Sequence, residues 1–285
     1  MTRLAVPKTY KLYIGGKFPR SESGRTYEVV SAGGVFVANA AKASRKDARD
    51  AVVAARAAQP GWSGATAYNR GQVLYRIAEL LEGRRVQFVD EIMTSEGVTS
   101  ATANAHVDSA IDTWVWYAGW ADKYVQAAGN ANAVSGPFFN ISVPEPTGVV
   151  AVIAPQDGAS LLGLVSVVAP ALVSGNTVVV IANEAAPLSA ISLAEVLATS
   201  DVPGGVVNVL TGSPAEMAPW LASHADVNAI DLAGAEMLDW VDLQISAAET
   251  LTRVLTPVHG VPSPSLERIV AFTETKTVWH TKSLI

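Results

Sequence analysis

The sequence predicts an α/β fold with a doubly wound, mainly parallel sheet, and two observations carry this prediction. Val149–Ala154 and Thr177–Ile181 are short apolar runs rich in β-branched residues, as in strands that are buried on both faces. Leu161–Val173, between them, is too long for one strand and ends at Ser174-Gly175-Asn176, which indicates a buried helix. A strand, a helix and a strand in this order place the loop 155–160 at the carboxyl edge of a parallel sheet, where such folds bind ligands.

The alternation of strands and helices continues after this unit. Further strands are expected over Val206–Leu210, Val227–Leu232 and Leu251–Leu255, and further helices over Pro187–Ala198, Ala215–Ser223 and Glu236–Ala247. This rhythm is typical of a sheet with helices on both faces. Beyond Thr256 the alternation of strands and helices stops, and the prolines and glycines that follow predict a linker over 257–264.

The first half of the chain predicts helices after a short hairpin over Lys11–Phe18. Ser44 is a candidate N-cap of a helix that ends at Gln59-Pro60-Gly61. Longer helical patterns cover Arg70–Ser95 and Ala101–Val125. Four aromatic residues share one face of the second pattern: Trp114, Tyr117, Trp120 and Tyr124. No basic residues are interleaved with them, so helix packing is a better interpretation than base stacking.

Two β-rich segments lie outside the alternating region. Val134–Val143 begins with turn residues and predicts an excursion away from the main sheet. Ile269–Phe272 and Thr277–His280 are expected to be terminal strands. Because they are too short to form a domain alone, they must dock on another part of the assembly.

Length and composition narrow the functional classes. The 285 residues are 49% apolar with a mean hydropathy of +0.27, which allows a full core and leaves apolar surface for association with another chain. A net charge of −6 without a Lys/Arg cluster argues against nucleic acid as a partner. No apolar run is long enough to span a bilayer and the amino terminus lacks a signal-peptide layout, which predicts no membrane partner and a cytoplasmic location. The absence of cysteine excludes disulfides, thiolate metal sites and a cysteine nucleophile.

Several stretches resemble the aldehyde dehydrogenase superfamily: YIGGKF, PTGVVAVIAP, VAPALVSGNTVVV, GGVVNVLTG, SHADVNAIDLAG and AFTETKTVWH. The resemblance implies a Rossmann-type dinucleotide-binding domain, here degenerate, over residues 1–129 and 146–256. It also implies a small β oligomerisation domain formed by residues 130–145 and 265–285. The linker 257–264 then stands where the family has its catalytic domain.

The residues that carry the chemistry of the resembled family differ here. The family has Trp-Asn-Phe-Pro after the first core strand, and its Asn helps to hold an oxyanion; this chain has Gln156, Asp157, Gly158 and Ala159. An ionised Asp157 would repel a developing oxyanion. Thr256–Gly260 replaces the family's Glu-Leu-Gly-Gly segment with the general base. Since the nucleophile, the oxyanion donor and the base are all missing, no catalytic residue is expected.

The cofactor-binding residues of the resembled family are partly retained. Of the family's Lys and Glu that hold the adenosine ribose, Ile181 replaces the Lys and Glu184 remains. In the family's Gly-Ser-x-x-x-Gly turn, Gly234 remains, Ala235 lacks the hydroxyl, and Asp239 adds bulk and negative charge. Glu184 and Gly234 are therefore candidate vestigial cofactor-binding residues, for which a framework role is the preferred interpretation. No bound cofactor is expected, and NAD is the alternative.

No other constellation in the sequence suggests catalysis. Four histidines are scattered without acidic residues at metal-ligand spacing, so no metal site is predicted: His106, His224, His259 and His280. Ser160 is better interpreted as a helix N-cap than as a nucleophile, because no histidine is placed to activate it.

The resulting hypothesis is a pseudoenzyme, a non-catalytic subunit similar to an aldehyde dehydrogenase. In the resembled family the oligomerisation strands of one subunit extend the catalytic-domain sheet of its neighbour. This chain has such strands, including Phe272 and Trp279, so the expected partner is a full-length aldehyde dehydrogenase paralogue that it scaffolds or regulates in a hetero-oligomer. Two alternatives stay open. One is an NAD(H)-binding subunit that contributes to aldehyde oxidation with partner residues, and the other is a stand-alone small-molecule sensor with a pocket around Gln156–Ser160.

Overall fold

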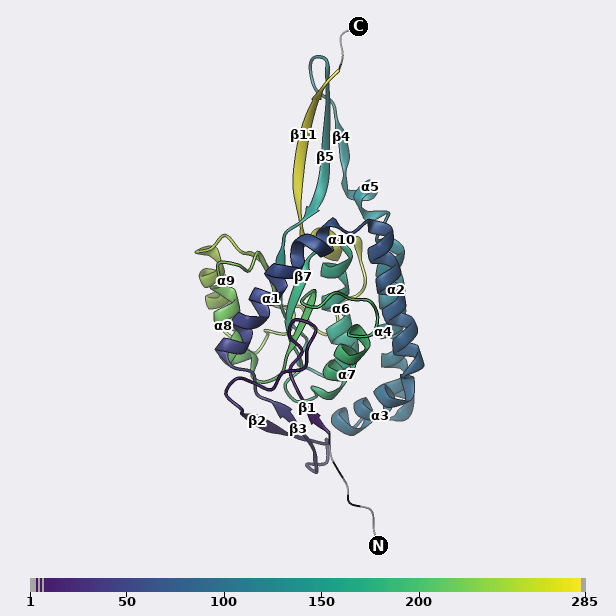
Figure 1. Ribbon diagram of the computed structural model, residues 1–285, viewed down its shortest axis with the longest axis vertical. Helices are drawn as coiled ribbons and strands as arrows, with labels where there is room; N and C mark the ends of the chain where they lie inside the picture. The colour runs from purple at the N-terminus through teal and green to yellow at the C-terminus, as the bar shows by residue number, and fades with distance from the viewer. Residues whose placement is uncertain (1–3, 5, 7, 283–285) are drawn as a thin grey trace.

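A five-stranded parallel sheet with helices on both faces forms the body of the molecule in the computed structural model, which describes residues 4, 6 and 8–282 (Figure 1). The strand order is β10-β9-β6-β7-β8. The strands are β6 (Val149–Ile153), β7 (Thr177–Ile181), β8 (Val207–Leu210), β9 (Ala229–Asp231) and β10 (Arg253–Leu255). The chain builds outward from β6 through β7 to β8 and then returns to pair β9 with the other side of β6. The topological switch point therefore lies between β6 and β9, and the predicted fold class is confirmed.

Alternate residues of the central strands enter two different hydrophobic cores. Val150 and Val152 of β6 join one core, whereas Val149 and Ile153 join the other. The first core is filled by α2 (Ala67–Gly83), α3 (Arg85–Glu96), α4 (Ser100–Trp120), α6 (Ser160–Val173) and α7 (Leu188–Leu197). The second core is filled by α1 (Arg45–Gly64), α8 (Pro214–Ala222) and α9 (Trp240–Ala248). This double burial explains why the strands are continuous apolar runs.

Helix α1 starts at the predicted N-cap, Ser44, but it does not end at Pro60 as predicted. It continues to Gly64, because Trp62 is buried and its Nε1 donates a hydrogen bond to the carbonyl of Leu172, 3.0 Å away. This tertiary anchor overrides the helix-breaking tendency of Pro60.

Each of the two long helical patterns divides into two helices. The first splits into α2 and α3 at Arg84, next to Gly83, and the second into α4 and α5 (Tyr124–Ala128). Trp114, Tyr117 and Tyr124 are fully buried and Trp120 is partly buried, which confirms the packing role of these aromatic residues. They do not share one helix, because Tyr124 belongs to α5.

The segment predicted as a hairpin near the amino terminus folds back on itself and also contacts the central sheet. Ile14 and Lys17 exchange two backbone hydrogen bonds across Gly15-Gly16 (2.9 and 3.0 Å), and the N–H of Leu12 donates to the carbonyl of Pro19 at 3.1 Å. Tyr13 exchanges two further backbone hydrogen bonds with Val209 of β8 (3.0 and 2.7 Å). The predicted tight turn at Gly15-Gly16 is therefore present, but its arms are isolated bridges and not the two strands expected. A separate small sheet is formed nearby by β1 (Thr9–Tyr10), β2 (Thr26–Val30) and β3 (Phe36–Ala41), in the order β1-β3-β2.

A third sheet, which is antiparallel, extends away from the body of the molecule (Figure 1). It contains β4 (Asn130–Asn132), β5 (Phe138–Pro146) and β11 (Thr273–Thr281), in the order β11-β5-β4. The predicted excursion over Val134–Val143 is present as most of β5, and β4 precedes it in the chain. The expected terminal segment 265–285 extends to residues 283–285, which lie outside the described residues.

The predicted strand over Ile269–Phe272 is wrong. Ile269 belongs to the short helix α10 (Leu266–Val270), whose N-cap Ser265 accepts a hydrogen bond from the N–H of Arg268 at 3.2 Å. Ile269 and Phe272 are both fully buried, so this segment anchors the start of β11 in the core of the body. Within the described residues, none of the helices combines the length and the hydropathy needed to cross a bilayer.

Candidate functional site

The carboxyl edge of the sheet at the switch point is the candidate site, and it encloses little space. The loops after β6 and β9 meet there and line a cavity of about 50 Å³ that includes Pro155, Asp157, Gly234 and Glu236. Val258, from the predicted linker 257–264, also lines it. Pockets that hold small molecules commonly enclose about 300–1,000 Å³. The cavity at this edge is therefore much smaller than a typical small-molecule pocket.

Gly234 is required by the close contact of two loops. A Cβ atom at this position would lie 1.9 Å from the carbonyl oxygen of Ala154. The N–H of Gly234 also donates to the carbonyl of Ile153 at 2.9 Å. These contacts give Gly234 a framework role that does not depend on any ligand.

Two amide side chains tie the loops after β6 and β7 together, a role that the sequence did not reveal. Gln156 Nε2 donates to the carbonyl of Ala154 (2.6 Å), and Gln156 Oε1 accepts from the N–H of Glu184 (2.9 Å). Asn183 Nδ2 donates to the carbonyl of Pro155 (3.2 Å). Because its amide is used within the framework, Gln156 does not replace the oxyanion donor of the resembled family.

Glu184 and Gly234 lie on opposite sides of β6 at the same edge of the sheet, since they follow β7 and β9 respectively. The carbonyl of Glu184 accepts a hydrogen bond from the hydroxyl of Tyr27 at 3.1 Å. Burial, assisted by the negative charge of Glu184, raises the pKa of Tyr27. The side chain of Glu184 is exposed, so this residue is held in place through its backbone.

The N-terminus of α6 is occupied by the carboxylate of Glu96, the last residue of α3. Glu96 Oε2 accepts from the N–H of Ala159 (2.9 Å), and Oε1 accepts from the N–H (2.9 Å) and the hydroxyl (2.6 Å) of Ser160. Ala159, with a φ of 45°, takes the N-cap position, and Ser160 is the first helical residue. The predicted N-cap role of Ser160 is therefore wrong, because a carboxylate 64 residues away satisfies the N–H groups instead.

The N-terminus of α9 also carries carboxylates. Asp239 is its N-cap and accepts a hydrogen bond from the N–H of Asp242 at 3.3 Å. Asp239 and Asp242 line a groove of about 400 Å³ between α8 and α9. A bound diphosphate is stabilised by free N–H groups and nearby cations. The protein places its own carboxylates at these two helix ends, so the residues present do not fit a diphosphate-bearing cofactor.

The histidines lie apart from one another. His106 Nδ1 lies 3.9 Å from Glu96 Oε2, and His259 Nδ1 lies 2.7 Å from Glu236 Oε1. His280 belongs to β11, remote in the fold from the α8 end where His224 lies. In the part of the chain that the structure describes, no three acidic or histidine side chains gather as a metal site would require.

A buried ion pair beneath the switch point joins β9 to the C-terminal segment. Arg268 Nη2 of α10 donates to Asp231 Oδ2 at 2.5 Å, and the Asp231 side chain is fully buried. Burial raises the pKa of Asp231, and the charge of Arg268 opposes this shift. Neither residue drew attention in the sequence, where no spacing rule connects them.

The two aromatic residues expected to meet a partner lie in different environments. Phe272 is fully buried, with the guanidinium of Arg268 over its ring, so it anchors β11 and offers no surface to another chain. Its predicted role as a partner contact is wrong. Trp279 is 58% exposed on β11 and packs edge-to-face against Phe138, with ring centroids 5.8 Å apart.

The doubly wound parallel sheet, with a glycine turn and helix N-termini at its switch point, defines the class of the molecule as Rossmann-like. Comparison with known proteins is more specific. The chain matches the aldehyde dehydrogenase family over residues 18–256, and it belongs to this family.

Individual relatives agree with this assignment. Over 271 residues the chain is 32% identical to aldehyde dehydrogenase, cytosolic 1 of Elephantulus edwardii, an overlap of 93% of this chain and 53% of that protein. Its structure is similar to that of HpcC from Thermus thermophilus, with a TM-score of 0.82, 30% identity, and coverage of 87% of this chain and 47% of the other. The betaine aldehyde dehydrogenase of Staphylococcus aureus in complex with NAD+ gives a TM-score of 0.79, 25% identity, and coverage of 86% and 48%. The chain spans about half the length of these relatives.

Proposed function

We propose that this chain is a non-catalytic member of the aldehyde dehydrogenase family that assembles with a full-length relative and scaffolds or regulates it. The observation that carries the proposal is the free edge of β11. This strand forms nine residue pairs with β5, and no other described strand pairs with its outer edge. A long exposed edge strand is a template for strand addition by another chain.

The free backbone groups of β11 can be assigned from its register. The N–H of Thr147 donates to the carbonyl of Phe272, and the N–H of Lys282 donates to that of Pro137. Hydrogen-bonded pairs recur at every second residue of an antiparallel ladder, so the even-numbered residues of β11 bond to β5. The N–H and C=O groups of Thr275, Thr277 and Trp279 therefore point toward the free edge.

The side chains around this edge suit a structural role in assembly. One face of the sheet carries a hydrogen-bonded row in which Ser142 Oγ lies 2.8 Å from Asn132 Nδ2 and 3.0 Å from Thr277 Oγ1. The opposite face exposes 56% of Phe139 and 40% of Ile141.

The lack of catalysis is inferred from residues inside the chain. No cysteine occurs in the sequence, and the connection from β10 to β11 holds only residues 256–272 with the short helix α10. We interpret residues 1–129 and 146–256 as a degenerate dinucleotide-binding domain, residues 130–145 and 265–285 as oligomerisation strands, and 257–264 as the linker that replaces the catalytic domain.

We further propose that the chain binds no NAD of its own. The carboxylates of Glu96 and Asp239 occupy helix N-termini, and the cavity beside Gly234 is too small for a dinucleotide. Glu184 and Gly234 are then vestiges of a cofactor site. We place the assembly in the cytoplasm, by analogy with the cytosolic relative.

Co-purification with a full-length aldehyde dehydrogenase of the same organism tests the assembly. Thr275→Pro removes an outward N–H without removing a bond to β5, whereas the matched control Thr275→Val keeps that N–H. The wild-type chain and Thr275→Val are expected to retain the partner, and Thr275→Pro to lose most of it while remaining folded by circular dichroism. Failure of the wild-type chain to capture any such enzyme, or equal capture by Thr275→Pro, would reject the proposed assembly.

Two measurements on the purified chain test whether it binds NAD and whether it oxidises an aldehyde. Calorimetric titration with NAD is expected to release no binding heat, and aldehyde with NAD is expected to give no NADH. Heat of binding would favour the alternative of a cofactor-binding subunit, and turnover by the chain alone would refute the non-catalytic assignment.

A further inference from the structure

A larger concave surface lies between α1 and α8, and none of its lining residues belongs to the candidate site. It encloses about 460 Å³ and is lined by the first two turns of α1 and by the end of α8 and the residues after it. This volume lies in the range of small-molecule pockets. Ala48 and Leu221 are buried at its floor, and Trp220 is partly buried beside them.

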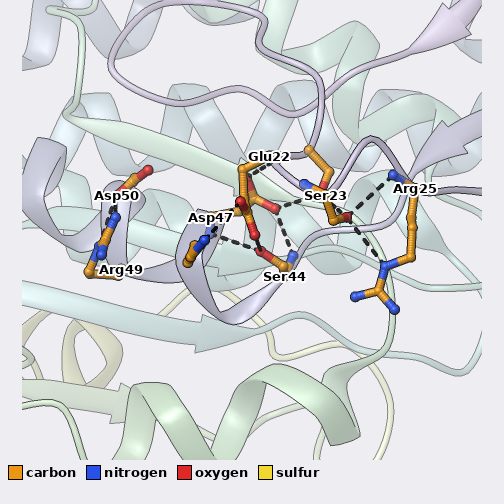
Figure 2. A network of polar contacts seen from close by, with 9 residues as sticks. Glu22, Ser23, Arg25, Ser44, Asp47, Arg49 and Asp50 are labelled. Carbon is orange, nitrogen blue, oxygen red and sulfur yellow. Dashed lines mark hydrogen bonds and ion pairs between the residues drawn. The ribbon is translucent and has the colours of Figure 1, made fainter.

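The acidic residue in the first turn of α1 does not face this groove. Figure 2 shows Asp47 within a network of polar contacts that ties α1 to the loop around Glu22. Its carboxylate accepts hydrogen bonds from the hydroxyl of Ser21 (2.7 Å) and from the N–H groups of Glu22 (3.0 Å) and Ser44 (2.7 Å). With Asp47 turned inward and 3% exposed, the side chains that line the groove from this turn are cationic.

One of the three cations that line the groove is not neutralised. Lys46 pairs with Glu22 at 3.2 Å, and Arg49 pairs with Asp50 at 2.7 Å. Arg45 has no carboxylate within 4.0 Å among residues 4, 6 and 8–282, and its guanidinium lies over the ring of Trp220. Stacking leaves the in-plane N–H groups of an arginine able to donate hydrogen bonds.

His224 adds a second donor to the wall of the groove. Its Nδ1 accepts a hydrogen bond from the N–H of Asp226 at 3.1 Å. In the neutral ring this contact places the proton on Nε2. The groove thus combines an apolar floor with two donors that suit an anion.

We infer that this groove binds a small organic carboxylate with an apolar or aromatic body. The carboxylate would pair with Arg45 and His224, and the body would pack on Trp220 and Leu221. One unpaired cation matches a single negative charge. A phosphate dianion would leave excess negative charge near Glu22 and Asp50. The inference concerns the chain alone and does not depend on its assembly with a partner.

Calorimetry with phenylacetate as the probe tests the inference. Phenylacetamide has the same body without the charge, and acetate has the charge without the body. Phenylacetate is expected to bind at least about tenfold more tightly than either compound. Arg45→Gln, an exposed substitution, is expected to weaken phenylacetate binding about tenfold. The matched control Arg76→Gln, which makes the same charge change on α2 outside the groove, is expected to leave it unchanged.

A second variant tests the apolar wall of the groove and leaves the charge of Arg45 unchanged. Trp220→Leu retains an apolar side chain but removes the stacking surface, and it is expected to weaken phenylacetate binding while Arg76→Gln does not. Three results would overturn the inference: no binding of phenylacetate up to about 10 mM, equal binding of phenylacetamide, or unchanged affinity in Arg45→Gln.

Discussion

Replacing Arg268 with methionine removes one partner of the buried pair that joins α10 to β9. Asp231 is fully buried and would keep one hydrogen bond, from the N–H of Ala233 at 3.0 Å. Removing one partner of a buried ion pair typically costs about 3–5 kcal/mol. A loss of 1 kcal/mol lowers the melting temperature of a chain of roughly this size by about 2–4 °C. The Arg268→Met protein is therefore expected to melt roughly 6–20 °C below the wild type.

The destabilisation should depend on pH in a defined direction. Burial raises the pKa of Asp231, and removing Arg268 removes the charge that opposes this shift. The folded variant then retains a proton that the unfolded chain has released, so its stability falls as the pH rises above the ordinary range of aspartate. Urea unfolding, followed by tryptophan fluorescence, should show a smaller difference from wild type at about pH 5.5 than at about pH 7.5.

Two further variants test whether the burial of Asp231 causes the loss of stability in Arg268→Met. The double variant Asp231→Asn/Arg268→Met keeps the acceptor for Ala233 and removes both charges, so it should recover much of the lost free energy of unfolding. Arg85→Met breaks exposed pairs with Glu82 and Asp108, both at 2.6 Å, and should cost less than about 1 kcal/mol. If Arg268→Met costs no more than Arg85→Met, or the double variant is no more stable than the single one, the reasoning about the buried pair is wrong.

Two other predictions concern packing and alkaline pH. Gly234→Ala places a Cβ 1.9 Å from the Ala154 carbonyl oxygen and should lower the free energy of unfolding by about 1–3 kcal/mol or more. Gly83→Ala in α2, where a Cβ would meet no atom within 4 Å, should raise the free energy of unfolding by about 0.5–1 kcal/mol. Similar urea midpoints for the two variants would contradict the close contact at Gly234. Burial raises the pKa of Tyr117 to about 12, so the unfolded chain ionises first and stability falls between about pH 10 and 12, by about 3 kcal/mol for this group. The loss of unfolding free energy over this interval should be smaller in Tyr117→Phe, and an unchanged loss would show that Tyr117 does not contribute.

The elements that the sequence predicted best are those whose environment is uniform along their length. Thr177–Ile181 was predicted to its terminal residues, because both faces of β7 are buried and the whole run is apolar. Predictions failed where a single long-range contact decides the outcome. The hydrogen bond of Trp62 extends α1 beyond Pro60, and the burial of Ile269 favours α10 over a strand.

The same distinction applies to the candidate site. Gly234, Glu184 and Asp157 could be named from the sequence, because they stand in recognisable turns after strands. Glu96 could not, since it reaches the N-terminus of α6 from another helix. The partner of Asp231 could not be found either, because α10 itself was not predicted.

Hydrogen-bond donors at the sheet edge, where the fold usually binds ligands, already have partners within the protein. This is why the proposed functions lie elsewhere on the molecule. At the switch point, donors that an anion would use already contact Glu96 and Asp239, and the amide of Gln156 is bonded within the framework. A ligand there would have to displace these bonds, and displacing Glu96 or Gln156 would leave partly buried polar groups without their partners. Among the described residues, unused backbone groups remain along the outer edge of β11, and an unpaired cation remains at Arg45. Binding at those two places breaks no internal contact, so a partner strand and a small carboxylate can be recognised there at lower free-energy cost than a dinucleotide at the sheet edge.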